Sequence, residues 1–244
     1  MTRALGPSAP GPSATTRGGA SPRRPGSLLD QLSPRDRSHL QRFGRPTSFG
    51  RGETLIPQGD DHPAVYLLTG GVVKATRTAL PDSPPMLITL FFPGDAPGTA
   101  DALLRSPAHI TYTATKPTRA LAVPRERFTD FVEYRREVTR TALAVLANEL
   151  RVRDMHLAHS TMDVRGRLVA FLGRQQVVSG VPTPEGVMLD LGLTQADLAA
   201  AIGAAPGTVG RELASLQERG VIGMGYCTIY IKKRLSPHSP EPEY

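Results

Sequence analysis

The chain has 244 residues, enough for one large domain or two ordinary ones, each with its own hydrophobic core. With 39% hydrophobic and 21% charged residues, and no apolar run near the ~20 residues of a membrane span, it is typical of a soluble protein without a membrane partner. Its one cysteine, Cys227, excludes a disulfide framework and cysteine-ligated zinc or iron–sulfur sites. Since no secretory signal is present, we expect a cytoplasmic protein. The net charge of +7 favours an anionic partner.

Both ends of the chain are predicted to be disordered. Residues 1–27 are rich in Gly, Pro, Ser and Arg, contain four arginines and no acidic residue, and lack apolar periodicity. We interpret them as a basic tail, and a basic arm that contacts DNA phosphates remains an alternative. Residues 236–244 are Pro-rich and form the second tail.

Residues 28–127 are predicted to form an antiparallel β-roll or barrel. Two short helices come first, and short apolar runs separated by Gly and Pro turns follow. The predicted strands are residues 54–56, 65–68, 72–75, 87–91 and 110–114.

Residues 128–162 form a long predicted helix with a break near Tyr134 and two apolar stripes. One stripe consists of Val138, Val145, Val152 and Met155, and the other of Leu143, Leu146, Leu150 and Leu157. Two stripes imply two partners, so we assign the first to a symmetry mate in a coiled-coil-like dimer and the second to the roll. The alternative is a helix buried on all sides in a monomer, which the arginines along it make costly.

Residues 163–235 are predicted to be a winged helix-turn-helix domain. Asp163 begins a helix, and a Gly/Pro loop at residues 179–186 leads to two helices at 194–203 and 206–219. A hairpin wing at residues 221–231 follows. A short turn between two helices, the second of them polar, fits the major groove of DNA. The residues expected to contact DNA are Thr194, Gln195, Pro206, Thr208, Arg211, Ser215, Lys232 and Lys233.

This order of parts and its motifs resemble the Crp/Fnr family of bacterial transcription regulators. The matching segments are 49–60, with Gly52-Glu53 and Gly59-Asp60, then 65–74, 93–95, 163–168 and 193–222. The resemblance implies an α+β fold: an N-terminal cyclic-nucleotide-binding-like antiparallel roll, a long dimerisation helix and a C-terminal winged helix-turn-helix. It also implies duplex DNA, a second copy of the chain and RNA polymerase as partners.

The effector pocket that the resemblance implies departs from the family pattern. Gly98 matches, but Thr99 stands where a carboxylate would hold a ribose, and Ala108-His109 replace the Arg-Ser pair that neutralises a cyclic phosphate. Arg105-Ser106 would substitute only if a loop were shortened, and Val152 and Arg153 would face the purine. We therefore expect no cyclic nucleotide in the usual mode and no certain cofactor; another small ligand, or none, is favoured.

The reading helix departs as well, because Ala205-Pro206-Gly207 replaces the family's Ser-Arg-Glu run. Arg211 matches a later family arginine that can bind a guanine or a phosphate. A structural pair of Arg211 with Glu212 or Glu218 is the alternative.

Other functions are less favoured by the sequence. His109 could ligate a haem or a metal, but a lone strand histidine is usually structural. His156 and His159 could share a metal across a dimer, but a solvated helix face is the favoured account, so we expect no metal site. An enzyme on the roll would need clustered ligands, but only His62 and His109 are present there, so we expect no enzymatic activity. A cyclic-nucleotide-sensing module whose helix-turn-helix docks proteins remains the main alternative.

Overall fold

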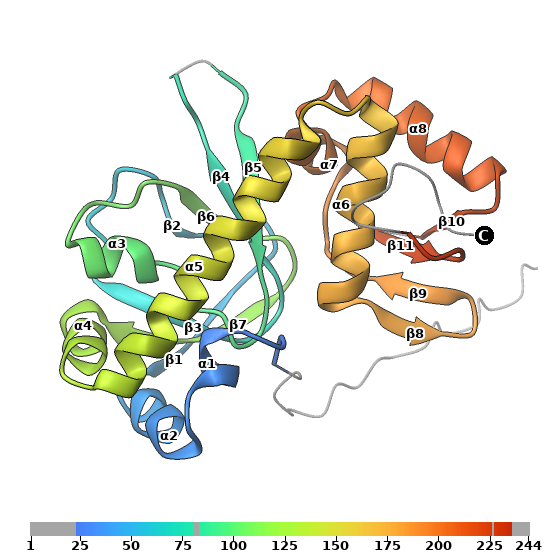
Figure 1. Ribbon diagram of the computed structural model, residues 1–244. Coiled ribbons are helices and arrows are strands. Elements are labelled where there is room, and N and C mark those ends of the chain that lie inside the picture. The colour runs from blue at the N-terminus through green and yellow to red at the C-terminus, as the bar shows by residue number, and fades with distance from the viewer. Residues whose placement is uncertain (1–22, 81–82, 226, 236–244) are drawn as a thin grey trace, which may run out of the picture.

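The computed structural model describes residues 23–80, 83–225 and 227–235, which form two parts connected by a long helix (Figure 1). A β-roll and its covering helices lie on the left of the figure, and a smaller helical domain with its own sheet lies on the right. This arrangement confirms the predicted α+β class and the order of the parts. The tails predicted at residues 1–22 and 236–244 lie outside the described residues. Within the described residues, no helix combines the length and the apolar character needed to cross a membrane.

Two antiparallel sheets form the roll, with strand orders β1-β7-β3 and β2-β6-β4-β5. The strands are β1 (Arg45–Phe49), β2 (Thr54–Ile56), β3 (Ala64–Gly70), β4 (Val73–Arg77), β5 (Met86–Phe91), β6 (Thr111–Ala114) and β7 (Thr118–Pro124). The five predicted strands are confirmed as β2 to β6, whereas the sequence pattern does not predict β1 and β7. The turn after β3 needs a glycine, because Gly71 has a φ of +88° and a Cβ there would lie 2.6 Å from the carbonyl oxygen of Pro117.

Short helices cover the roll: α1 (Leu28–Gln31), α2 (Pro34–Arg42), α3 (Thr99–Leu104) and α4 (Arg125–Glu133). The predicted break near Tyr134 is confirmed, since this residue ends α4 just before the long helix. The expectation of disorder up to residue 27 is wrong for residues 23–27. Ser27 is completely buried and Arg24 forms an ion pair with Asp95, so this segment packs on the roll.

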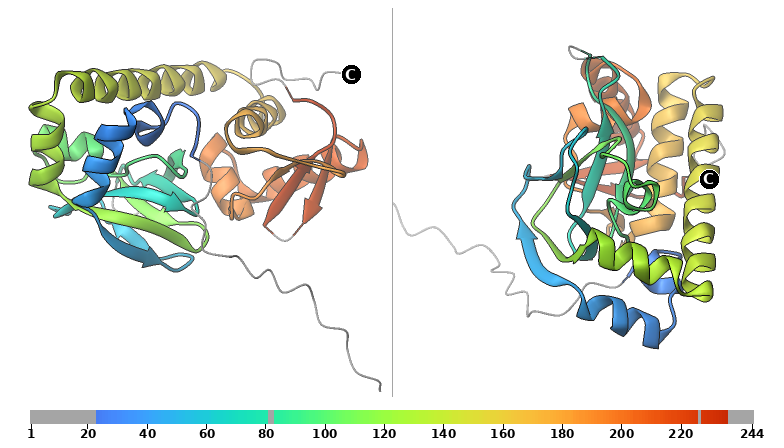
Figure 2. Two further views of the ribbon diagram at one scale, coloured as in Figure 1. Left: turned by 90° about the horizontal axis from the view of Figure 1, so that it is seen from below. Right: turned by 90° about the vertical axis from the view of Figure 1, so that its left-hand side faces the viewer.

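The long helix α5 (Arg136–His159) lies along one face of the roll (Figure 2). Val138 and Val145 are 1% and 8% exposed, and Val138 packs with roll residues such as Phe128. The dimerisation role predicted for these two valines is therefore wrong, because their side chains are covered by their own protomer. The exposed stripe of the helix is made of Leu143, Leu150 and Leu157, with exposures of 61%, 59% and 73%. Val152 and Met155, also assigned to dimerisation, are half-buried, and Val152 lies on the side of the helix that faces the roll.

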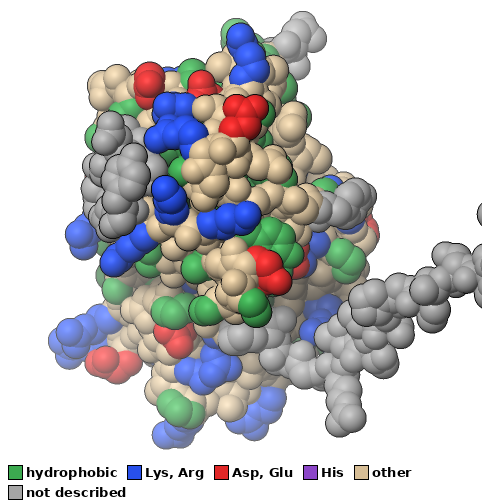
Figure 3. All heavy atoms as spheres, turned by 90° about the vertical axis from the view of Figure 1, so that its right-hand side faces the viewer, with side chains coloured by type: hydrophobic (Ala, Val, Ile, Leu, Met, Phe, Trp, Pro, Cys, Tyr) green, Lys and Arg blue, Asp and Glu red, His purple; other side chains and the backbone are tan. Residues whose placement is uncertain are grey.

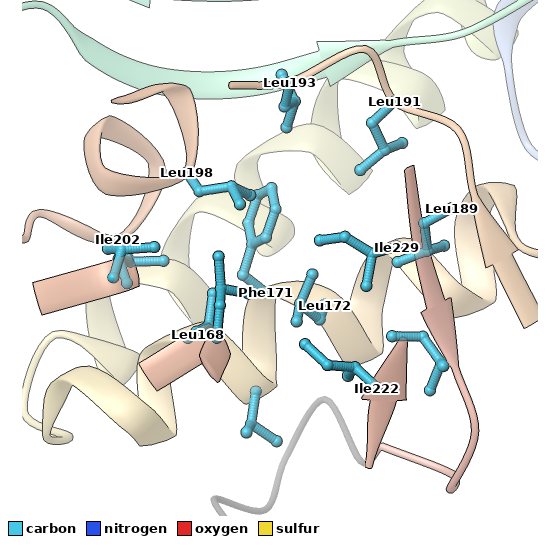
Figure 4. Packing of buried hydrophobic residues seen from close by; sticks show 14 of the residues in the cluster. Leu168, Phe171, Leu172, Leu189, Leu191, Leu193, Leu198, Ile202, Ile222 and Ile229 are labelled. Atoms are coloured by element: carbon cyan, nitrogen blue, oxygen red, sulfur yellow. The ribbon is translucent and has the colours of Figure 1, made fainter. Parts of the chain in front are cut away.

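The smaller domain is a winged helix-turn-helix with one more hairpin than the sequence predicts. Its elements are α6 (Val164–Ser179), β8 (Val181–Thr183), β9 (Gly186–Leu189), α7 (Gln195–Ile202), α8 (Pro206–Glu218), β10 (Ile222–Gly225) and β11 (Thr228–Ile231). The sheet order is β10-β11-β9-β8. Residues 179–186, predicted as a loop, instead contain β8 and the turn into β9, because β8 pairs with β9, which in turn pairs with strand β11 of the wing. Apolar residues of α6, α7, β9 and the wing meet in one core (Figure 4).

The two parts share that hydrophobic core. Val72, Leu87, Leu90 and Phe92 of the roll belong to the same buried cluster as Leu198 and the other core residues of the smaller domain. Polar contacts reinforce the junction: Lys74 Nζ lies 2.5 Å from Asp197 Oδ1, and Thr115 Oγ1 donates a hydrogen bond of 2.6 Å to the carbonyl oxygen of Leu191. Lys116 also pairs with Asp190. The helix-turn-helix is thus held against the roll by both packing and charge.

Candidate nucleic-acid interface and roll pocket

The first helix of the pair, α7, has both ends fixed by local interactions. Thr194 and Asp197 form a capping box: the Thr194 hydroxyl accepts from the Asp197 amide at 3.1 Å, and Asp197 Oδ2 accepts from the Thr194 amide at 2.9 Å. Gly203 ends the helix in the left-handed conformation with a φ of +62°. These features confirm the predicted bounds of α7 and set the short turn before α8.

The second helix, α8, buries one face and exposes the other. Val209, Leu213 and Leu216 are buried in the domain core, while the first turn at Pro206 and the side chain of Arg211 are exposed. Arg211 Nη2 donates to Thr208 Oγ1 at 3.3 Å. Among the described residues Arg211 forms no ion pair, which argues against the structural pairing with Glu212 or Glu218. Its charge is therefore available to an external acceptor.

An arginine of α6 that the sequence analysis did not single out orients α8. Arg165 Nη2 donates to Ser215 Oγ at 2.8 Å, and its Nε lies 3.1 Å from Glu212 Oε2. Ser215, predicted as a DNA contact, therefore has its hydroxyl directed toward α6. The sequence signal for this contact is a pair of acceptors three positions apart on one helix, Glu212 and Ser215, together with an arginine on a neighbouring helix.

The remaining predicted contact residues surround α8. Gln195, in the first turn of α7, lies over Gly210 of α8, since a Cβ on Gly210 would be 3.3 Å from Gln195 Oε1. Lys232 and Lys233 are exposed at the end of β11, where both backbone amides donate to the Val221 carbonyl. Figure 3 shows that side of the molecule, with Lys and Arg side chains distributed over it and fewer acidic ones.

The pocket residues predicted in the roll are only partly brought together. Thr99, His109 and Arg153 line a cavity of about 20 Å³, together with Tyr112 and Glu149. Val152 and Arg153 line an adjoining cavity of about 70 Å³. Gly98 begins α3 beside these cavities, close to the ring of His62.

Arg105 and Ser106 are absent from the linings of both cavities, so their predicted role as a replacement anion site is wrong. The side chain of Arg105 is exposed and lies 3.4 Å from Glu133 of α4. The carbonyl oxygen of Ser106 accepts a hydrogen bond from Arg125. The loop before β6 therefore keeps these residues on the outside of the roll.

Ionisable side chains of both kinds line the small cavity, namely Asp95, Glu149, His109 and Arg153, and Asp101 pairs with His109. His109 Nδ1 lies 2.5 Å from Asp101 Oδ1, and Asp101 Oδ2 is buried without a hydrogen-bond partner among the described residues. Burial, followed by the charge of Asp95, raises the pKa of Glu149. Burial also raises the pKa of Tyr112, with the charge of Asp101 acting in the same direction. In the part of the chain that the structure describes, no three His, Cys, Asp or Glu side chains are grouped to hold a metal ion.

Comparisons with known proteins agree with this geometry. Residues 46–135 match the cyclic nucleotide-binding domain family, and residues 166–235 match the Crp-like helix-turn-helix domain family. The CRP-like cAMP-activated global transcriptional regulator of Mycobacterium tuberculosis is 32% identical over 198 residues, covering 80% of this chain and 87% of that protein. The global nitrogen regulator of Synechococcus elongatus is 30% identical over 197 residues, covering 79% and 85%.

Solved structures share the fold. FixK2 from Bradyrhizobium japonicum has a TM-score of 0.66 at 24% identity, covering 78% of this chain and 93% of its own. The c-di-GMP responsive global regulator CLP of Xanthomonas campestris has a TM-score of 0.68 at 16% identity, covering 82% and 99%. The matches span the roll, the long helix and the helix-turn-helix, and therefore the chain belongs to the Crp/Fnr family of DNA-binding transcription regulators.

Proposed function

We propose that this regulator acts as a homodimer that places α8 of each protomer into successive major grooves, about 34 Å apart. The observation that carries this proposal is the exposed polar face of α8, on which Arg211 has no competing ion pair within the described residues. Thr208 and Gln195 flank it, and Lys232 and Lys233 suit backbone phosphates. Since the first turn of α8 is Pro206-Gly207, few side chains reach base edges, and specificity depends more on DNA shape and half-site spacing. The regulator would act in the cytoplasm, where the chromosome is. RNA polymerase is proposed as a further partner because the chain resembles other members of the family.

Capture of genomic DNA fragments by the purified protein, followed by anisotropy titrations, tests this function. We expect Arg211→Ala to weaken binding to the selected operator by roughly 1–3 kcal/mol. Arg219→Ala, which removes the same charge at the far end of α8, is the matched control and should cost less. A steep decrease of affinity with salt is also expected, because DNA binding releases counterions. Equal affinity for selected and shuffled duplexes would contradict the proposal.

The partner surface of the proposed dimer is the exposed leucine stripe of α5. Leu143, Leu150 and Leu157 recur every seven residues and are mostly exposed in the protomer. A repeat of seven on one helix face is the pattern of a coiled-coil seam. Pairing of two such stripes would remove the largest apolar side chains of the helix from water.

We further infer that the roll does not take a cyclic nucleotide in the family's usual mode. Thr99 cannot act as a ribose acceptor in the way a carboxylate would, and Arg105 faces away from the cavities. Glu149, which lines the small cavity, interacts with the charge of Arg153 and so reduces the attraction of that arginine for a phosphate. Calorimetric titration with cAMP and cGMP should therefore show no saturable binding at micromolar concentrations.

A further inference from the structure

An arginine from the N-terminal segment (residues 23–32) reaches the larger roll cavity. Arg24 Nη2 lies 2.6 Å from Asp95 Oδ1, and Arg24 Nε lies 3.0 Å from Asp95 Oδ2. The two side chains are only 19% and 5% exposed, so this bidentate pair is largely shielded from water. Such a fork onto a carboxylate is the geometry with which proteins bind guanidinium groups strongly.

The turn beneath Arg24 is shaped to receive this segment. The Arg24 amide donates to the carbonyl oxygen of Pro93 at 2.7 Å, and the Leu29 amide donates to that of Gly94 at 3.0 Å. Gly94 has a φ of +97°, and a Cβ there would lie 2.3 Å from Ser27 Oγ. Only glycine permits so close an approach, which shows that the contact is built into the backbone of the roll.

The cavity behind Arg24 offers further acceptors that lack donors. Gln175 is 4% exposed and lines this cavity, and its Oε1 has no partner among the described residues. Glu149 lines the same cavity, and burial raises its pKa, with the charge of Asp95 second. Arg153 and Arg174 border it too, and Nη1 of Arg174 also has no hydrogen-bond partner among the described residues. Burial lowers the pKa of Arg174 to about 10. The space of about 70 Å³ has room for a small polar group.

We propose that this cavity is a binding site for guanidinium compounds, that Arg24 is its resident ligand, and that a soluble guanidino molecule competes with Arg24 for Asp95. The acceptors Asp95, Glu149 and Gln175 match the donors of a planar guanidinium. When Arg24 is removed, the two carboxylates face the two remaining arginines of the lining, and Asp95 has lost the guanidinium that it binds in the protein. Because Arg24 is tethered four residues before the buried Leu28, its effective concentration at the site is on the order of millimolar. A soluble competitor must therefore exceed that level, or the tethered arginine must first be removed.

Chemical rescue tests the proposal without DNA, so its outcome is independent of the function proposed above. Removal of the guanidinium in Arg24→Ala leaves Asp95 without its ion-pair partner and should lower the melting temperature. Millimolar methylguanidinium chloride should then restore it in a saturable way, by roughly 3–6 °C at ten times the dissociation constant. Wild-type protein should respond at least tenfold more weakly, because Arg24 already fills the site.

Matched variants separate specific binding from ionic effects. Arg23→Ala removes the same charge from the exposed neighbouring position and should behave as wild type. The double variant Arg24→Ala, Asp95→Asn should lose the response, and tetramethylammonium chloride should produce none. If Arg24→Ala does not fold, Arg24→Lys keeps the charge but loses the fork and should show a partial response. Equal responses of Arg23→Ala and Arg24→Ala (or of Arg23→Ala and Arg24→Lys), or equal effects of both salts, would overturn the proposal.

Discussion

Replacement of Leu150 by alanine tests the dimer surface of α5 most directly. Leu150 is 59% exposed in the protomer, and complete burial of a leucine stabilises by about 1.5–3 kcal/mol. In a two-fold symmetric dimer the Leu150 side chains of both protomers are buried, so the substitution removes two leucines from each interface. Leu150→Ala should therefore weaken dimerisation by about 2–3 kcal/mol, which is roughly a 30- to 150-fold increase in the dissociation constant of the dimer. Sedimentation equilibrium over a range of protein concentrations measures this constant.

The control is a valine of the opposite stripe. Val138 is 1% exposed within its own protomer, so Val138→Ala should lower the free energy of unfolding by about 2 kcal/mol and leave the dimer constant nearly unchanged. Leu150→Ala should do the reverse, because an exposed side chain contributes little to the fold of the monomer. If Val138→Ala weakened the dimer more than Leu150→Ala did, the sequence-based assignment would be right and the structural one wrong.

Three further outcomes are expected in denaturation experiments. Lys74→Met removes the partner of Asp197 between the two parts and should lower the free energy of unfolding by about 1.5–3 kcal/mol at neutral pH. Burial raises the pKa of Asp197, but the hydrogen bonds from Lys74 and Thr194 and the charge of Lys74 together lower it below its ordinary value. This stabilisation is therefore complete above about pH 4 and is lost as the pH falls through the folded pKa. Lys74→Met should make the stability depend less on pH in this acid range. Burial lowers the pKa of His156 from 6.5 to about 3, and the charges of Arg174 and His159 contribute to this shift. As the pH falls, His156 therefore binds a proton in the unfolded chain before it does so in the folded protein, and the free energy of unfolding should decrease below pH 6.5. The decrease should be smaller in His156→Gln, which has no group that titrates there. Thr194→Ala removes the N-cap side chain of α7 and should lower the free energy of unfolding, measured by urea titration, by about 1 kcal/mol. An unchanged free energy of unfolding would mean that Asp197 caps the helix alone.

Strands with alternating apolar residues between Gly and Pro turns were predictable, and strands without them were not. β1 lies at a sheet edge and has no buried residue in its burial pattern, so it leaves little hydrophobic signal. β8 is likewise an edge strand with exposed residues around Pro182. β7 is central, but Arg119, Ala120 and Ala122 favour strands only weakly. β1 and β7 form by pairing with segments distant in sequence, whereas β8 forms a hairpin with β9, which directly follows it.

Periodicity identified both stripes of α5 but could not say which partner each stripe meets. A helical repeat defines faces, and the neighbour of each face depends on how α4 enters the roll. In the structure the small side chains of Val138 and Ala142 pack closely against α1 and α4, and the longer leucines are left outside. The size of the residues in the two stripes therefore indicated which stripe packs on the protomer, and an argument from periodicity alone does not include it.

Arg24 was beyond prediction because its partner is 71 positions away and its own segment is of low complexity. The consequence extends to the helix-turn-helix, since the elements around the Arg24 cavity also contact the reading domain. β5 supplies Leu90 both to this cavity and to the core shared with α7. α6 supplies Gln175 to the cavity and Arg165 to the face of α8. An occupant that changes the spacing of β5 and α6 therefore acts on both helices of the pair, and it shifts DNA affinity only if it binds one arrangement of these elements better than another.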